Sequence, residues 1–151
     1  MEIKSRLFEN VDAQALSVLF AHMERKEVAR GEKLRKEGQT CDSAFFLLEG
    51  AVSVTKRSGD EDVEVATVRG GEDVCFSLTS LIDGGVSLTT LSVTEAGAIA
   101  VLEKDVFEDF CKSHADAGVI LKGNILSALA GFLRQADGKI AEMYKTLEEV
   151  L

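Results

Sequence analysis

The feature of this chain that most constrains its fold is the spacing of its apolar residues. This spacing is helical near the N-terminus, changes to every second residue, and then becomes helical again. Behind Asp12, a residue type that caps helices well, apolar residues recur at helical spacing as far as Met23. From about Glu27 the period is two, and at Lys104 it returns to helical. A strand-rich region therefore lies between two helical regions.

The strand-rich region consists of short apolar segments separated by glycine and polar residues. The segments are Ala44–Leu48, Ala51–Thr55, Val63–Val68, Val86–Val93 and Ala98–Leu102. A polar turn over 58–62 joins the second and third segments, as in a hairpin. Many short strands with this punctuation favour a small antiparallel roll or barrel over a parallel α/β sheet. We therefore predict a mainly β fold, an antiparallel β-roll of the jelly-roll kind with flanking helices.

The C-terminal region predicts a short helix that includes Val106, Phe107 and Phe110, and then helix from about Asp116 to Leu151. Apolar residues in the second helix follow spacings of three and four in alternation: Leu126, Leu129, Leu133, Ala136, Ile140, Met143, Leu147 and Val150. This heptad pattern predicts a coiled-coil seam and a parallel homodimer. The alternative is a single amphipathic helix that lies on its own domain. We expect a roll with its N-terminal helix over 1–110 and a helical dimerisation segment over 111–151.

Composition and charge exclude several classes of protein. The net charge is −9, with 26 acidic against 17 basic residues, which argues against binding to nucleic acid. No uninterrupted run of 18 apolar residues occurs, so we expect no membrane span. The N-terminus carries acids early and lacks the apolar segment of a secretory leader. These features predict a cytoplasmic protein.

The cysteine and histidine content argues against a metal site or an active site. Cys41, Cys75 and Cys111 form no paired motif and are read as reduced thiols. His22 and His114 lie far apart in the sequence, and only Cys111 is a near neighbour of the latter. The motifs of serine hydrolases, P-loop enzymes and zinc proteases do not occur. We therefore predict a protein that is not an enzyme and holds no metal.

The order of motifs resembles the cyclic nucleotide-binding domain family, which includes the sensor domain of catabolite activator proteins. The matching positions are Gly31-Glu32, Leu34 and Glu37-Gly38, then Phe45 to Val54 with its internal Gly50, the strand Val65–Val68, and the turn Gly71-Glu72. This resemblance covers roughly residues 7–110. It implies a β-roll fold, a regulatory function, and a C-terminal helix that is reoriented when ligand binds.

The resemblance also implies a phosphate-binding cassette between residues 76 and 91. In the family a glutamate of this cassette holds the ribose, and an arginine pairs with the cyclic phosphate. When Thr89-Thr90-Leu91 is placed on the family's Ala-Thr-Val, Ser87 stands at the arginine and Leu78 at the glutamate. The ligand-binding residues expected from this placement are Phe76, Ser77, Leu78, Ser87, Leu88 and Thr89.

The cassette lacks the charge that a cyclic phosphate needs, because no Lys, Arg or His occurs between Gly70 and Leu102. A charge-assisted hydrogen bond contributes about 1.5–3 kcal/mol. We therefore predict that cyclic AMP and cyclic GMP bind weakly or not at all, and that no cofactor is held. Cys75 beside the cassette could act as a ligand or redox site, although a lone cysteine more often serves as a small buried hydrophobe.

Two hypotheses for the function remain open at this stage. The first is a regulatory ligand-sensing module that dimerises through its C-terminal helix and signals to a partner protein. In this hypothesis the chain has no room for a DNA-binding domain after the predicted seam. The second is a ligand-free scaffold for dimerisation or docking, which the missing cation favours. The polar residues Ser87, Thr89 and Thr90 favour the first hypothesis, since an empty pocket would not need them.

Overall fold

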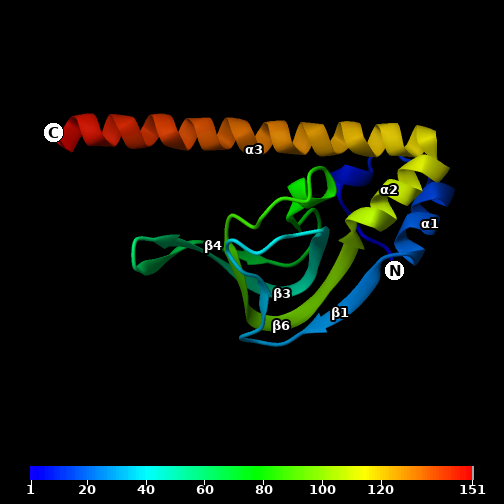
Figure 1. Ribbon diagram of the computed structural model, residues 1–151, viewed down its shortest axis with the longest axis horizontal. Coiled ribbons are helices and arrows are strands. Elements are labelled where there is room, and N and C mark those ends of the chain that lie inside the picture. The colour runs from blue at the N-terminus through cyan, green and yellow to red at the C-terminus, as the bar shows by residue number, and fades with distance from the viewer. Residues whose placement is uncertain (151) are drawn as a thin grey trace.

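The protein is described here by a computed structural model of residues 1–150, in which a curled antiparallel sheet is flanked by helices (Figure 1). The strands are β1 (Glu24–Val28), β2 (Lys33–Arg35), β3 (Ser43–Ser58), β4 (Glu61–Arg69), β5 (Cys75–Phe76) and β6 (Thr90–Glu103). The helices are η1 (Arg6–Phe8), α1 (Ala13–Ala21), η2 (Leu78–Leu81), α2 (Lys104–Ser113) and α3 (Ala115–Val150). The prediction of a mainly β roll with flanking helices is confirmed.

The sheet is built around two long strands. Its path is β1-β6-β3-β4, while β2 pairs with β6 and β5 pairs with β3, and every pairing is antiparallel. The predicted polar hairpin turn joins β3 to β4. Figure 1 shows this hairpin extending from the roll in the same direction as α3.

Glycines sit inside the long strands where we expected strand ends. Gly50 adopts φ +93° at an irregularity of β3, and Gly97 lies in β6 against the main chain of Glu49, where a Cβ would collide. These glycines let β3 and β6 bend past each other without breaking, so pairs of predicted short strands are single strands.

The predicted strand Val86–Val93 is shorter in the structure. Strand β6 begins only at Thr90, and Val86 makes one isolated bridge with Thr40. The segment over 86–89 alternates in sequence, but it has no neighbouring strand to pair with beyond that bridge. It therefore forms the end of the cassette loop.

The two faces of the sheet bury different apolar clusters. The helix-side core joins Phe46 and Leu102 of the sheet to residues of the helices, including Phe107 of α2 and Leu121 and Ile125 of α3. The inner core fills the roll with Val28, Phe45, Leu47, Val52, Leu91, Val93, Ile99 and Val101. Side chains alternate between the faces along each strand, so Phe45 points into the roll and Phe46 toward the helices.

The helices follow the sequence prediction closely. Asp12 accepts a hydrogen bond from the Ala15 amide at 3.1 Å and caps α1. Helix α2 starts at Lys104, and the boundary expected between 110 and 111 falls within it. The predicted domain division therefore remains a prediction, and the last residue of the predicted helix, Leu151, lies outside the described residues.

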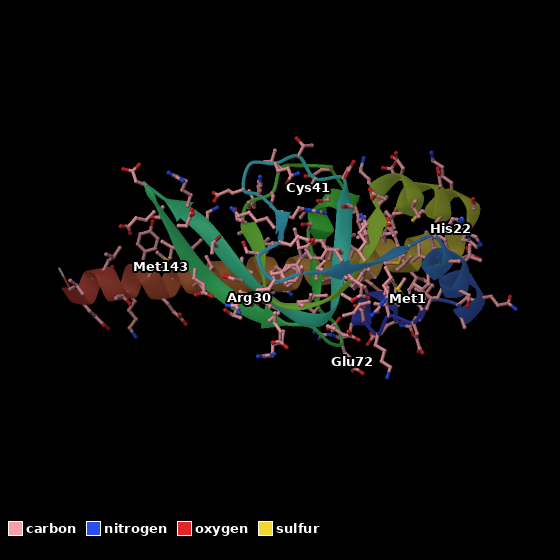
Figure 2. All side chains as sticks on the ribbon, turned by 90° about the horizontal axis from the view of Figure 1, so that it is seen from below. Met1, His22, Arg30, Cys41, Glu72 and Met143 are labelled. Carbon is pink, nitrogen blue, oxygen red and sulfur yellow. The ribbon has the colours of Figure 1, made fainter. Side chains whose placement is uncertain are left out.

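Helix α3 has two parts with different surroundings. Its first part, residues 115–131, packs on the roll, and Ala117, Gly118, Leu121 and Ile125 are buried there. The second part is residues 132–150. Its second part extends past the roll, and Met143 lies on this part (Figures 1 and 2). Every residue over 132–150 is exposed.

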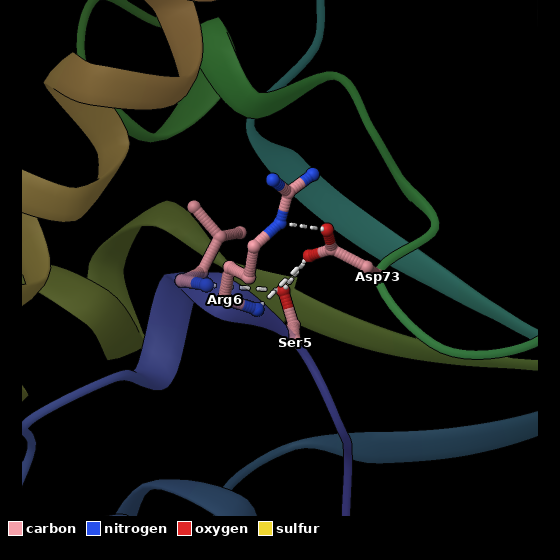
Figure 3. A network of polar contacts seen from close by, with 4 residues as sticks. Ser5, Arg6 and Asp73 are labelled. Atoms are coloured by element: carbon pink, nitrogen blue, oxygen red, sulfur yellow. Dashed lines mark hydrogen bonds and ion pairs between the residues drawn. The ribbon is translucent and has the colours of Figure 1, made fainter.

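The N-terminal segment ties the first part of α3 to the sheet. Asp73, which precedes β5, accepts hydrogen bonds from Ser5 Oγ at 2.8 Å and from the Arg6 amide at 2.9 Å (Figure 3). It also pairs with Arg6 Nε at 2.6 Å. On the other side, Asn124 of α3 donates to the carbonyls of Leu7 and Glu9. The segment thus bridges the cassette strand and the helix.

Candidate ligand-binding site

The cassette begins with a short strand and a single helical turn. Phe76 of β5 stacks on Phe45 inside the roll, with ring centroids 5.3 Å apart. Ser77 then adopts a left-handed conformation, with φ 61° and ψ 35°, and precedes η2. Leu78 of η2 is buried in the helix-side core instead of the roll interior. The front of the cassette therefore directs Phe76 and Leu78 to different cores.

The end of the cassette is held by hydrogen bonds to the loop after β2. The Ser87 amide donates to the Gln39 carbonyl at 2.8 Å, and the Ser87 carbonyl accepts from the Gly38 amide at 2.8 Å. The Ser87 hydroxyl donates to the Thr89 carbonyl at 2.7 Å. Leu88 is exposed. The one hydroxyl donor that we placed at the family's arginine position is therefore already used within the loop.

Two cations from other strands approach this region, which the sequence analysis did not identify. Lys56 of β3 places Nζ 2.9 Å from the Leu88 carbonyl and 3.7 Å from Glu37 Oε1. Glu37 also accepts from the Arg57 amide at 2.8 Å, and its own amide donates to Thr90 Oγ1. Lys56 is thus a half-exposed cation at the rim of the cassette.

The second cation, Arg35 of β2, lies over the ring of Phe45, with its guanidinium carbon 5.2 Å from the ring centroid. One terminal nitrogen donates to the Leu34 carbonyl at 3.0 Å. The other donates to the Ser43 carbonyl at 2.8 Å and to Ser43 Oγ at 2.6 Å. Its Nε is buried and has no hydrogen-bond partner among the described residues.

The acidic residues near the cassette are engaged with local partners on the surface. Glu72 lies 3.4 Å from Lys4 Nζ, and Glu95 pairs with Arg69 at 2.8 Å. Asp83 accepts from the Gly85 amide. Burial raises the pKa of Asp73, but hydrogen bonds from Arg6 and Ser5 outweigh it and hold the pKa below its ordinary value. These carboxylates are therefore partly offset, and they oppose an anion less than the sequence suggests.

Cys75 is partly buried against the helix-side core. Burial, and to a lesser extent the charge of Asp73, raise its pKa to about 12. A thiol with that pKa is protonated at neutral pH and is a poor nucleophile and metal ligand. This favours the small-hydrophobe interpretation over a ligand or redox site.

Two cavities lie outside the roll interior. One of about 490 Å³ separates the N-terminal segment, the cassette front and α3, and it is lined by Arg6, Asp73, Leu78 and Phe132 among others. A smaller cavity of about 200 Å³ lies between α1 and α2. His22 and His114 both line the smaller one, so the fold brings together two histidines that are distant in sequence. Residues 1–150 contain no cluster of three metal-ligating side chains.

Helix α3 carries more apolar surface than the roll covers. By length and composition alone it is the one helix of residues 1–150 that could cross a membrane, with a stretch of mean hydropathy 1.3. The sequence analysis considered only uninterrupted apolar runs and did not detect this stretch. Since its first part is packed on the roll, α3 also fits the pattern of a helix that belongs partly to a protein core.

Comparison with known proteins gives two kinds of sequence relative. The chain is 20% identical over 143 residues to a CRP-like cAMP-activated global transcriptional regulator of Mycobacterium tuberculosis. The match covers 95% of this chain and 62% of that protein. It therefore spans less than two thirds of that regulator. It is also 31% identical over 134 residues to glutaminase 1 of Bradyrhizobium diazoefficiens, of which it covers only 21%.

Solved structures show the same fold. The catabolite activator protein of Thermus thermophilus matches with a TM-score of 0.79 and 18% identity, over 92% of this chain and 63% of that one. The N-terminal domain of a transcriptional regulator from Streptomyces coelicolor matches with a TM-score of 0.72 and 26% identity, over 89% and 92%. Residues 25–114 match the cyclic nucleotide-binding domain family, from β1 to the end of α2. With the roll, the cassette and this match, the chain belongs to the cyclic nucleotide-binding domain family.

Proposed function

We propose that the protein is a regulatory ligand-sensing module in which the state of the cassette is passed on by α3. The observation that carries this proposal is a shared core. Leu78 and Leu81 of η2 are buried in the same cluster as Leu121 and Ile125 of α3. Because protein cores are close-packed, a shift of η2 on ligand binding would displace α3.

Cyclic nucleotides should bind this module weakly. In our placement of the cassette, Leu78 and Ser87 occupy the family's glutamate and arginine positions, and the Ser87 hydroxyl already donates to Thr89. Burying a phosphate without a paired cation costs several kcal/mol. The cassette by itself therefore offers a cyclic phosphate no charge to pair with.

We propose that the module acts as a homodimer through the second part of α3. Most of its exposed apolar residues fall on the predicted heptad, namely Leu133, Ile140, Met143, Leu147 and Val150, while Phe132 and Tyr144 are exposed beside it. Leu126, the first residue of the heptad, is also exposed and lies in the first part. Leu129, also in the heptad, is partly buried against the roll. A heptad stripe of this length is matched by an identical stripe on a second copy, which favours a parallel pair over contact with a membrane. A vesicle-binding measurement that gave membrane association and no dimer would contradict this choice.

The module's output is expected to reach a partner protein. We infer a cytoplasmic protein that is not an enzyme and does not bind nucleic acid by this chain, which its acidic balance supports. The transcriptional regulators that it resembles extend beyond the matched region.

The test is a thermal-shift and calorimetry series with cyclic AMP, cyclic GMP and small anions. Ligands that bind only the folded state raise Tm, so a sensing module should be stabilised by at least one of them. Ser87→Arg should raise the affinity for cyclic AMP at least about tenfold. Submicromolar binding by the unmodified protein would overturn the expectation of weak binding. Absence of any stabilisation would favour the ligand-free scaffold.

A further inference from the structure

We propose that Arg35 of β2 is the anion-pairing residue of the roll interior, and that the module's ligand is an oxyanion, a carboxylate or a phosphate, held by its guanidinium. This rests on the proposed sensing function. The residue that pairs with the ligand's charge then lies on β2, where the sequence analysis did not predict it, and not in the cassette as in the family.

An irregularity of β2 between Lys33 and Arg35 brings Arg35 to the inner face of the roll, against which its neighbour Leu34 also packs. Arg35 is directly opposite Leu91 of β6, and Leu91 is directly opposite Val54 of β3. Residues in such a row share one face of a sheet. Leu91 is buried in the inner core and Val54 packs against it. The guanidinium over the ring of Phe45, itself an inner-core residue, confirms this direction.

The charge of Arg35 has no counter-charge. Arg6, Arg25 and Arg69 each form an ion pair with a carboxylate at the surface. Arg35 is partly buried and forms no ion pair with any residue of the described chain. Buried charges in proteins are normally paired, since desolvation of a lone charge is costly. The partly buried guanidinium of Arg35, with its buried Nε–H, therefore lacks the counter-charge that an anionic ligand would supply.

The guanidinium is oriented but not saturated. An arginine has five N–H donors, and those of Arg35 reach only the Leu34 carbonyl and the two oxygens of Ser43. Its Nε–H is buried without a partner. The neutral acceptors Leu34 and Ser43 therefore hold the guanidinium in one orientation and leave some of its N–H donors free. A fixed guanidinium with free donors is the arrangement that binds a carboxylate or a phosphate.

Aromatic contacts link this cation to the cassette. Phe45 carries Arg35 on its ring and also stacks on Phe76, the first residue of the cassette. An anion that shifts the guanidinium would therefore also shift the Phe45 ring, which packs against Phe76 of the cassette. Binding of an anion at Arg35 would thereby change the position of η2, which immediately follows Phe76 and Ser77.

The experiment compares Arg35→Met with Arg30→Met in the full chain. Both substitutions remove one positive charge, but Arg30 is exposed on the turn after β1 (Figure 2). The probes are inorganic phosphate, acetate, cyclic AMP and the neutral nucleoside adenosine, each followed by Tm and by the arginine Nε–H signals in NMR spectra. The three anions distinguish phosphate from carboxylate and a free oxyanion from a nucleotide, and adenosine reports binding without an anion.

In the unmodified protein, at least one anion should shift the Arg35 Nε–H signal and raise Tm. Arg35→Met should weaken that anion about ten- to a hundredfold, and Arg30→Met should leave it unchanged. Without ligand, Arg35→Met should change Tm only slightly, because removal of an unpaired charge offsets the loss of its hydrogen bonds to Leu34 and Ser43. A lower Tm together with unchanged anion affinity would show that Arg35 has only a structural role.

The outcomes separate this inference from the proposed function. Equal anion affinity in Arg35→Met and the unmodified protein would overturn the role of Arg35 and leave ligand sensing intact. Binding of adenosine but of no anion would have the same meaning. If no probe binds the unmodified protein at millimolar concentration, both proposals fail.

Discussion

The two parts of α3 continue one helix but differ in what covers their apolar residues. In the first part, Leu121 and Ile125 are 2% exposed and belong to the helix-side core. In the second part, Leu133 is 65% exposed and Met143 64%. Apolar residues recur at helical spacing in both parts. Hydrophobic spacing therefore predicts a helix and its apolar face, but not whether the same chain or another one covers that face.

Because of this difference, we expect the two parts of α3 to have separate roles. The first part is attached to the roll, because it shares a core with η2 and is hydrogen-bonded through Asn124 to the N-terminal segment. The second part offers an apolar stripe that a second copy can cover. Perturbing each part separately should therefore affect different properties, stability in the first and assembly in the second.

The largest effect is expected from Leu133→Lys together with Ile140→Lys in the second part. Both residues are exposed in the single chain, so the roll should keep its fold and its circular dichroism. In the proposed dimer, the two changes bury unpaired charges at the seam. The dissociation constant should rise at least about a hundredfold. Light scattering and sedimentation measure the change.

A matched control places the same added charge off the seam. Gln135→Lys with Ala141→Lys adds two lysines at heptad positions that face away from the predicted partner. This pair should leave the dimer intact. If the unmodified protein is a monomer at high micromolar concentration, the seam interpretation is wrong and the second part needs another partner.

The next largest effect is expected from Leu121→Ala in the first part. Leu121 is fully packed among the roll and the other helices, and loss of a buried leucine costs about 2–5 kcal/mol. The free energy of unfolding should fall by that amount in denaturant titration. The dissociation constant of the dimer, measured where the variant is still folded, should hardly change. A coupled loss of both would show that the two parts of α3 do not act separately.

Most of the fold could be predicted from the sequence because hydrophobic spacing, turn residues and helix caps are local features. The cap at Asp12, the hairpin after Ser58 and the start of α2 at Lys104 all follow from neighbouring residues. The merging of short strands into β3 and β6 was not predicted, because Gly50 and Gly97 are read as breaks. Whether such a glycine ends a strand depends on the main chain opposite it.

The candidate site was less predictable for a related reason. The search for a cation was confined to the cassette, whereas Arg35 and Lys56 reach the roll from β2 and β3. One signal was available, because Lys56 continues the alternation of Val52 and Val54 and so shares their inner face. Arg35 gave no comparable signal, since its direction follows from a register with Leu91 that only the folded sheet defines.

A smaller effect is expected where the N-terminal segment supports the first part of α3. Asp73→Asn keeps a side chain that tolerates the φ of 64° at this position but removes the charge that Arg6 and Ser5 bind. Stability at neutral pH should fall by about 1 kcal/mol. Urea titrations at several pH values measure it.

The pH dependence of that effect has a definite sign. The pKa of Asp73 in the folded protein lies below its ordinary value of 3.8, so its contribution is complete above that value and is lost as pH falls through the lower, folded-state pKa. The unmodified protein and Asp73→Asn should therefore converge in stability in acid. A difference that stayed constant with pH would mean that the charge of Asp73 does not stabilise the segment.

The smallest effect, and the sharpest comparison between the two parts, comes from Gly123→Ala and Gly138→Ala. Both glycines are helical, and a Cβ at either would meet no atom within 4 Å. Each change should therefore stabilise the helix by up to about 1 kcal/mol. Because Gly123 lies in the part that packs on the roll, its replacement should raise the Tm of the roll. Gly138 lies beyond the roll and off the heptad seam, so its replacement should leave that Tm unchanged, raise the helical signal at low concentration and tighten the dimer severalfold. An increase in the roll's Tm from Gly138→Ala would mean that the second part of α3 folds as one unit with the roll, and the division between the two parts would have to be given up.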